Sequence, residues 1–102
     1  MPRVIKGVLR EELANSRRMQ RRYEQALRRM GRGSLVKKRI GSQDYYYLAA
    51  REGDRVRFRY LGKLSAQALR ERQAQRRQRG QYRRLLSEVK QQIRFLERSL
   101  RG

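Results

Sequence analysis

The chain has 102 residues, the usual size of one domain, so we expect a single domain over residues 1–102. Lys and Arg number 29 against 9 Asp and Glu, and the resulting formal net charge of +20 predicts an anionic partner, above all nucleic acid. The absence of Cys and His excludes disulfides, thiolate metal sites and most nucleophile–base pairs, so we expect no metal, no cofactor and no enzymatic activity.

The first predicted element is a long amphipathic helix over residues 4–30. Apart from Gly7 this stretch contains neither Gly nor Pro. Its apolar residues recur at helical spacing: Leu9, Leu13, Tyr23, Leu27 and Met30. Ser16 and Gln20 fall on the same stripe, so a break or a solvated stretch in the middle of the helix is one expectation.

Three short strands are predicted over residues 34–61, after a helix cap and turn at Gly31 and Gly33. The strands are enriched in Tyr, Val and Ile, and turn-forming residues separate them: Ser34–Ile40, Tyr45–Arg51 and Arg55–Leu61. Because the connections are short, we expect an antiparallel meander.

Ser65 is a good N-cap for a second helix over residues 65–100, in which a break at Gly80 is one expectation. Beyond that glycine, apolar residues alternate spacings of four and three: Tyr82, Leu86, Val89, Ile93, Leu96 and Leu100. Such a stripe needs a partner helix. The first helix would give an antiparallel hairpin and an α+β fold, whereas the same stripe of a second copy would give a homodimer.

The pairing of the second and third strands decides which side chains share a face. With Glu52–Asp54 as a three-residue loop, Leu48 lies opposite Phe58 on an apolar face that we expect to pack on a helix. The other face would combine cations with aromatic rings, a mixture typical of nucleic-acid-binding surfaces. A one-residue change of register would exchange the faces, and a merely solvated basic face is the simpler alternative.

The predicted nucleic-acid-binding residues of the sheet come from all three strands. The second and third strands supply Tyr45, Tyr47, Arg55, Arg57 and Arg59. The first strand supplies Lys37 and Arg39, or else Lys38. The cations would neutralise phosphates, while the tyrosines would stack on bases or hydrogen-bond to the backbone.

A second basic cluster lies on the C-terminal helix, where hardly any carboxylate compensates the cations between Arg72 and Arg84. We expect phosphate contacts from five of its arginines: Arg72, Arg76, Arg77, Arg79 and Arg83. Neighbouring cations extend this cluster along both helices: Arg17, Arg18, Arg21, Arg22, Arg70 and Arg84. A solvated helix face is the alternative interpretation.

The stretch from Gly33 to Ala68 contains four short motifs: GSL at 33–35, YYYL at 45–48, REG at 51–53 and YLGK at 60–63. This stretch resembles a segment of bacterial, archaeal and mobile-element proteins. It is also similar to the three-stranded DNA-binding sheet at the N-terminus of some tyrosine recombinases. The resemblance implies that outward residues of the sheet face a DNA groove: Tyr45, Tyr47, Arg55, Arg57 and Arg59. It implies no recombinase activity, since the long helices at both ends depart from that family.

Together these features predict a non-enzymatic protein that binds DNA or structured RNA through arginine–phosphate contacts. The alternative is a structural or assembly subunit of a ribonucleoprotein or of a larger nucleic-acid enzyme, held by its helical stripe. No apolar run approaches the roughly 20 residues that span a bilayer, and the N-terminus lacks the apolar core of a secretory signal. We therefore expect a cytoplasmic protein without a membrane partner.

Overall fold

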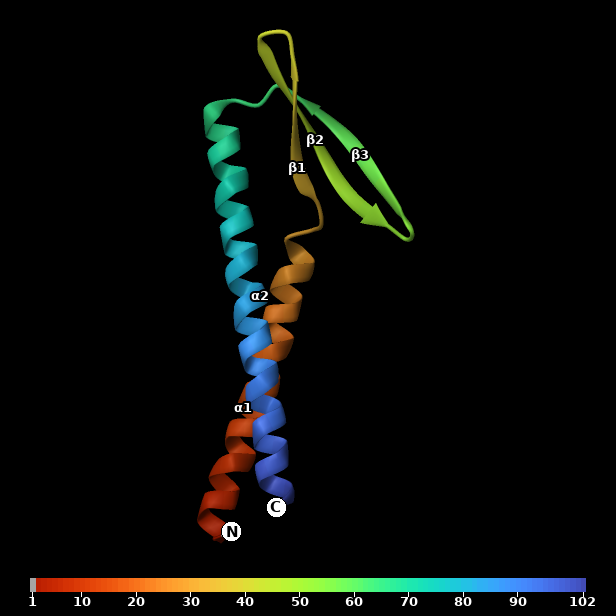
Figure 1. The fold of residues 1–102 in the computed structure, drawn as a ribbon. Helices are drawn as coiled ribbons and strands as arrows, with labels where there is room; N and C mark the ends of the chain where they lie inside the picture. Colours follow the sequence, from red (N-terminus) through yellow and green to blue (C-terminus); the bar gives the residue numbers. More distant parts are fainter. Residues whose placement is uncertain (1) are drawn as a thin grey trace. The chain divides into compact units, whose positions relative to one another are not determined.

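The computed structural model describes residues 2–102, which form a helix, three strands and a second helix. In chain order the elements are α1 (Arg3–Arg29), β1 (Ser34–Ile40), β2 (Gln43–Glu52), β3 (Arg55–Gly62) and α2 (Ala66–Arg101) (Figure 1). The predicted α+β class and the order of its elements are confirmed.

The chain forms two compact units. One contains α1 and residues 78–102, and the other contains residues 30–77, with the sheet and the first turns of α2. Helix α2 contributes residues to both units, since it runs from Ala66 to Arg101 without interruption. The single domain over residues 1–102 stays a prediction.

An apolar cluster joins α1 to α2 within the helical unit. Its buried centre and the residues packed against it come from both helices: Leu9, Leu13, Ile93, Leu96 and Leu100. The pairs Ser16–Gln92 and Tyr23–Tyr82 show that the helices run antiparallel, since residue numbers rise along one as they fall along the other (Figure 1). The predicted helical hairpin is thus confirmed, and the C-terminal stripe packs on the first helix.

The middle of α1 is neither broken nor solvated, contrary to the expectation drawn from its polar residues. Ser16 is completely buried, and its Oγ accepts a 2.9 Å hydrogen bond from Nε2 of Gln92. The same amide nitrogen lies 3.2 Å from Oε1 of Glu12 and donates to it. A small polar side chain therefore fills this part of the interface, where close packing leaves no space for a larger one.

The second helix begins at the predicted cap and continues through its glycine. The backbone nitrogen of Ala68 donates to Oγ of Ser65 at 3.1 Å, which satisfies one of the free N–H groups of the first turn. The break considered at Gly80 does not occur, because α2 extends from Ala66 to Arg101. A Cβ atom at Gly80 would meet nothing within 4 Å, so packing does not require glycine there.

The strands form the predicted antiparallel meander in the order β1–β2–β3. Both hairpins turn over two residues with glycine first, Gly41-Ser42 and Gly53-Asp54. Gly41 has a φ of +64° and Gly53 one of +63°, whereas neither residue that follows has a positive φ. This is the pattern of type II′ turns, whose twist matches that of the strands they join.

The pairing of β2 with β3 differs by one residue from the predicted register. Glu52 pairs with Arg55, so the second hairpin has a two-residue loop and the expected three-residue loop is wrong. As a result Phe58 lies opposite Ala49 and not opposite Leu48, and the neighbouring pairs shift in the same way. Because side chains alternate between the two faces of a strand, this shift exchanges the faces of β3 relative to β2.

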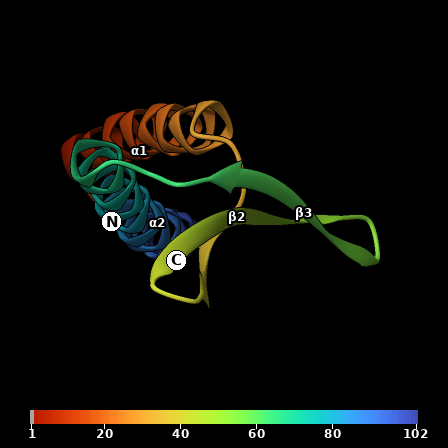
Figure 2. The ribbon, with the colours of Figure 1, turned by 90° about the horizontal axis from the view of Figure 1, so that it is seen from above.

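A bulge ends the regular pairing of these two strands. Tyr47 pairs with Tyr60 and Tyr46 with Gly62, so Leu61 is an extra residue of β3. Gly62 has a φ of +81°, a conformation that glycine adopts without strain. Figure 2 shows β2 and β3 as a curved and twisted ribbon.

Candidate nucleic-acid interface

The observed register brings most of the predicted sheet cations onto one side, which we call the basic face. Its side chains alternate with those of the opposite face along each strand. The basic face contains Leu35, Lys37, Arg39, Asp44, Tyr46, Leu48, Ala50, Glu52, Arg55, Arg57 and Arg59. The cations lie on the edge strands β1 and β3, on either side of the central strand.

Two carboxylates pair with cations of the basic face. Nε of Arg57 lies 2.9 Å from Oε2 of Glu52, and both side chains are largely exposed. Nη1 of Arg39 lies 3.6 Å from Oδ1 of Asp44. This distance allows an ion pair but is too long for a hydrogen bond, and the buried Oδ1 has no hydrogen-bond partner among the described residues. The exposed Arg57–Glu52 pair is weak, and its arginine can exchange the carboxylate for a phosphate.

The opposite side of the sheet, which we call the aromatic face, gathers rings and aliphatic groups. It contains Ser34, Val36, Lys38, Ile40, Gln43, Tyr45, Tyr47, Ala49, Arg51, Val56, Phe58 and Tyr60. The rings of Tyr47 and Tyr60 touch, with centroids 5.2 Å apart and planes tilted by 56°. Of the predicted first-strand cations, Lys38 lies here, opposite Tyr45.

The prediction that Tyr45 and Tyr47 share one face of the sheet with the three β3 arginines is wrong. Those tyrosines lie on the aromatic face, whereas Arg55, Arg57 and Arg59 lie on the basic face. The prediction that the apolar side of β3 packs on a helix is also wrong, since Phe58 remains 62% exposed. The cause of both errors is the two-residue turn, which shifts β3 by one position.

Sequence reasoning therefore missed Phe58 and Tyr60 as surface residues. A usable signal was present, because Gly53-Asp54 has the glycine-first order that a two-residue type II′ turn prefers. A two-residue loop would have placed Phe58 on the same face as Tyr45 and Tyr47.

The predicted arginines of α2 are divided between the two units. Arg72 and Arg76 lie one turn apart in the unit that contains the sheet, and Arg79 and Arg83 lie one turn apart in the helical unit. Arg76, Arg77 and Arg83 are exposed, whereas Arg72 and Arg79 are half-buried. The buried Nε of Arg79 has no hydrogen-bond partner among the described residues.

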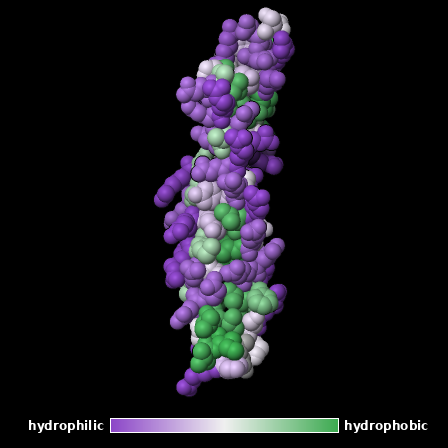
Figure 3. All heavy atoms as spheres, turned by 90° about the vertical axis from the view of Figure 1, so that its left-hand side faces the viewer, coloured by the Kyte–Doolittle hydropathy of each residue, from purple (hydrophilic) through white to green (hydrophobic). Residues whose placement is uncertain are grey.

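The arginines of α1 are solvent-accessible as well. Arg17 pairs with Glu97 of α2 at 3.7 Å, with half of its side chain exposed. Arg18, Arg21 and Arg22 are exposed. Hydrophilic side chains cover most of the face drawn in Figure 3, where apolar side chains form separate groups. Both helices therefore present cations to solvent.

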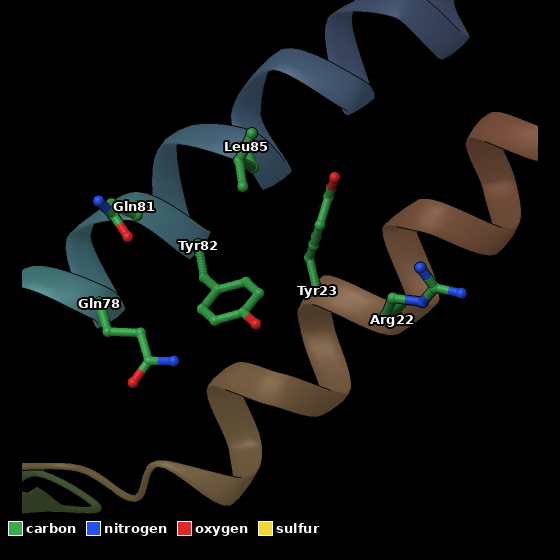
Figure 4. A pocket seen from close by; sticks show the side chains of 6 residues that line it. All are labelled: Arg22, Tyr23, Gln78, Gln81, Tyr82 and Leu85. Atoms are coloured by element: carbon green, nitrogen blue, oxygen red, sulfur yellow. The ribbon is translucent and has the colours of Figure 1, made fainter. Parts of the chain in front are cut away.

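An open pocket of about 340 Å³ lies between α1 and α2 in the helical unit. Six residues line it: Arg22, Tyr23, Gln78, Gln81, Tyr82 and Leu85 (Figure 4). The rings of Tyr23 and Tyr82 approach each other, with centroids 6.0 Å apart and a tilt of 55°. The guanidinium of Arg22 points away from Tyr82 (Figure 4). This lining offers ring faces, phenolic hydroxyls, amide groups and one guanidinium.

Two further properties concern membranes and metals. Within residues 2–102, neither helix combines the length and the apolar character that crossing a bilayer requires. The same part of the chain holds no cluster of three or more His, Cys, Asp or Glu side chains suited to a metal ion.

The fold and its surfaces define a small, strongly basic α+β protein in which a three-stranded meander connects two long helices. The chain belongs to the family described as a domain of unknown function, DUF6788, whose model matches residues 8–71. That match covers most of α1, the whole sheet and the first turns of α2. No curated protein and no solved structure matches the chain.

Proposed function

We propose that this protein binds DNA or structured RNA through phosphate contacts of its exposed arginines, without catalysing a reaction. We also propose a cytoplasmic location, because the proposed partner is nucleic acid inside the cell. The similarity of residues 33–68 to the DNA-binding sheet of tyrosine recombinases supports DNA as one such partner.

The supporting observation is the shortage of internal partners for the cations. Among residues 2–102, three ion pairs form, Arg17–Glu97, Arg39–Asp44 and Arg57–Glu52. The chain has 29 Lys and Arg, so most of them face water without a carboxylate. Like charges at this density repel one another, and a polyphosphate that neutralises them gains entropy from the counterions it releases.

The basic face fits phosphate contacts better than a random scatter of cations would. Alternate residues of a strand lie about 6.7 Å apart, so Arg55, Arg57 and Arg59 reach separate phosphates along a nucleic-acid backbone. Each guanidinium presents a planar fork of donors that matches two phosphate oxygens. Of the three, Arg55 and Arg59 have no carboxylate partner among the described residues, whereas Arg57 must first release Glu52.

The experiment is a salt titration of binding to duplex DNA, with the charge-neutralising double variant Arg55→Gln, Arg59→Gln. Each lost phosphate contact lowers the slope of log K against log salt by about 0.9, so we expect a reduction of about 1.8. The matched control is Arg3→Gln, Arg10→Gln, which removes the same charge from exposed positions of α1. Absence of wild-type binding at low salt to both duplex DNA and a structured RNA would overturn the proposal, whereas an equal reduction in the control would show that the basic face contributes no more than other exposed arginines.

A second candidate function is assembly through a partner helix, and one observation favours it. At the start of α1, Val4 is 78% exposed, Ile5 52% and Val8 57%, although the main stripe of α2 is already packed on α1. Light scattering after size-exclusion chromatography tests this candidate. A helical oligomer that forms without nucleic acid and dissociates in Val4→Ser, Val8→Ser would support it, whereas a monomer would exclude self-assembly through this end.

A further inference from the structure

The aromatic face of the sheet has no role in the phosphate contacts proposed above, yet it is the most apolar exposed surface of its unit. Phe58 is 62% exposed, Tyr60 57% and Val56 55%. All three are neighbours on β3, and Val36 of β1 adds to the same face at 39% exposure. A group of exposed apolar side chains on one side of a sheet marks an interaction surface.

The cross-strand pairs leave the Phe58 ring open on one side. Its partner on β2 is Ala49, whose methyl group covers little of a neighbouring ring. By contrast Tyr60 leans on Tyr47, with ring centroids 5.2 Å apart. A planar group can therefore lie over Ala49 against the Phe58 ring and next to the tyrosine pair, in the offset geometry that aromatic stacking prefers.

The charges around these rings indicate what kind of partner the face accepts. Lys38 and Arg51 belong to the aromatic face, and Nζ of Lys63 lies 5.9 Å from the centroid of the Tyr45 ring. The carboxylates of the described strands, Asp44 and Glu52, both lie on the basic face instead. A ligand that is planar and apolar at its centre but anionic along its backbone complements this arrangement.

Single-stranded nucleic acid has both properties, because its phosphates are anionic and its unpaired bases expose flat aromatic surfaces. In a duplex the bases are stacked on one another, so protein rings cannot reach their flat surfaces. We propose that the aromatic face binds unpaired nucleotides of DNA or RNA, with bases stacked on Phe58 and Tyr60 and phosphates held by Lys38, Arg51 and Lys63. This inference rests on the proposed nucleic-acid binding and specifies the part of the ligand that the sheet recognises.

The test compares the variants Phe58→Ala and Tyr60→Ala with the wild-type chain. Fluorescence anisotropy measures binding to an oligonucleotide of about 12 unpaired nucleotides and to a duplex of the same length, a size within the footprint of small single-strand-binding domains. We expect each variant to bind the single strand roughly 5- to 100-fold more weakly and the duplex unchanged. Val56→Ala is the matched control, because it shortens an exposed, non-aromatic neighbour on the same face.

A second readout does not depend on affinity. The chain contains no Trp, so Phe58→Trp introduces a single tryptophan at the proposed stacking position. A base stacked on that ring should quench its fluorescence when the single strand is added, and the variant should retain wild-type affinity because it keeps an aromatic surface. Circular dichroism checks that the exposed substitutions leave the fold unchanged.

The outcomes separate this inference from the proposed function. Unchanged single-strand affinity in Phe58→Ala, together with weaker binding in Arg55→Gln, Arg59→Gln, overturns the stacking inference and leaves phosphate binding intact. Absence of any nucleic-acid binding by the wild-type chain overturns both. Self-association without nucleic acid that Phe58→Ala abolishes would assign the aromatic face to a second copy of this chain and also overturn the inference.

Discussion

The substitution Ser16→Leu distinguishes what the structure predicts from what the helical pattern alone would predict. Ser16 interrupts an apolar stripe, and leucine both continues that stripe and favours helix more than serine does. The pattern therefore predicts a more stable protein. In the structure, however, Ser16 is completely buried between the helices and bonded to Gln92 at 2.9 Å.

The expected destabilisation follows from this packing. Forcing a larger side chain into a filled site costs about 1–3 kcal/mol. The lost hydrogen bond adds about 0.5–1.5 kcal/mol, at the low end here because Gln92 is exposed and can bond to water instead. For a domain of this size, a loss of 1 kcal/mol lowers the midpoint of thermal unfolding by about 4–8 °C. The two costs sum to at least about 1.5 kcal/mol, so we expect Ser16→Leu to lower Tm by at least about 6 °C.

Thermal unfolding followed by circular dichroism measures this effect. Ser87→Leu provides the matched control, because Ser87 is an exposed residue of α2 and the same exchange there should change Tm little. A higher Tm in Ser16→Leu would refute the reasoning, since it would mean that Ser16 does not lie against α2.

Two further predictions concern glycines. Gly80→Ala should raise the free energy of unfolding by up to about 1 kcal/mol, because the glycine lies inside a continuous helix with open space around it; a lower Tm would contradict an unbroken α2. Gly33→Ala should lower it by about 1–3 kcal/mol, because φ is +134° and the new Cβ would lie 2.9 Å from Leu48. Urea denaturation measures this loss, and Gly53→Ala is the control, because Gly53 also has a positive φ, +63°, but open surroundings. An equal loss of unfolding free energy in both variants would show that the Leu48 contact is unimportant.

The two faces of the sheet suggest a division of tasks under the proposed function. The edge-strand cations of the basic face suit a phosphate backbone, whereas the rings of the aromatic face suit unpaired bases. Both faces belong to residues 34–62, within the stretch that the DUF6788 family model matches. Variants of Arg55 and Phe58 therefore test separate contributions of one small sheet to binding.

The sequence by itself determined the elements of this fold, because local rules act within a few residues of the chain. The Ser65 cap places the start of α2, and the glycine-first dipeptides at residues 41 and 53 place the turns of the meander. The apolar spacing from Tyr82 to Leu100 predicted a helix that needs a partner, and α1 is that partner. The excess of arginine predicted an exposed cationic surface in the same way, since few carboxylates are available to pair with it.

Only the tertiary structure decided which side chains meet. The glycine-first order of Gly53-Asp54 favours a two-residue loop but does not exclude a three-residue one, and the difference turns Phe58 from the basic to the aromatic face because side chains alternate with a period of two. Likewise Ser16 interrupts the apolar stripe of α1 when the sequence is considered alone. Its role in the helix interface depends on the hydrogen bond from Gln92, which lies 76 positions away in the chain. Contacts between distant segments depend on the packing of whole elements, and local patterns do not specify that packing to within one residue.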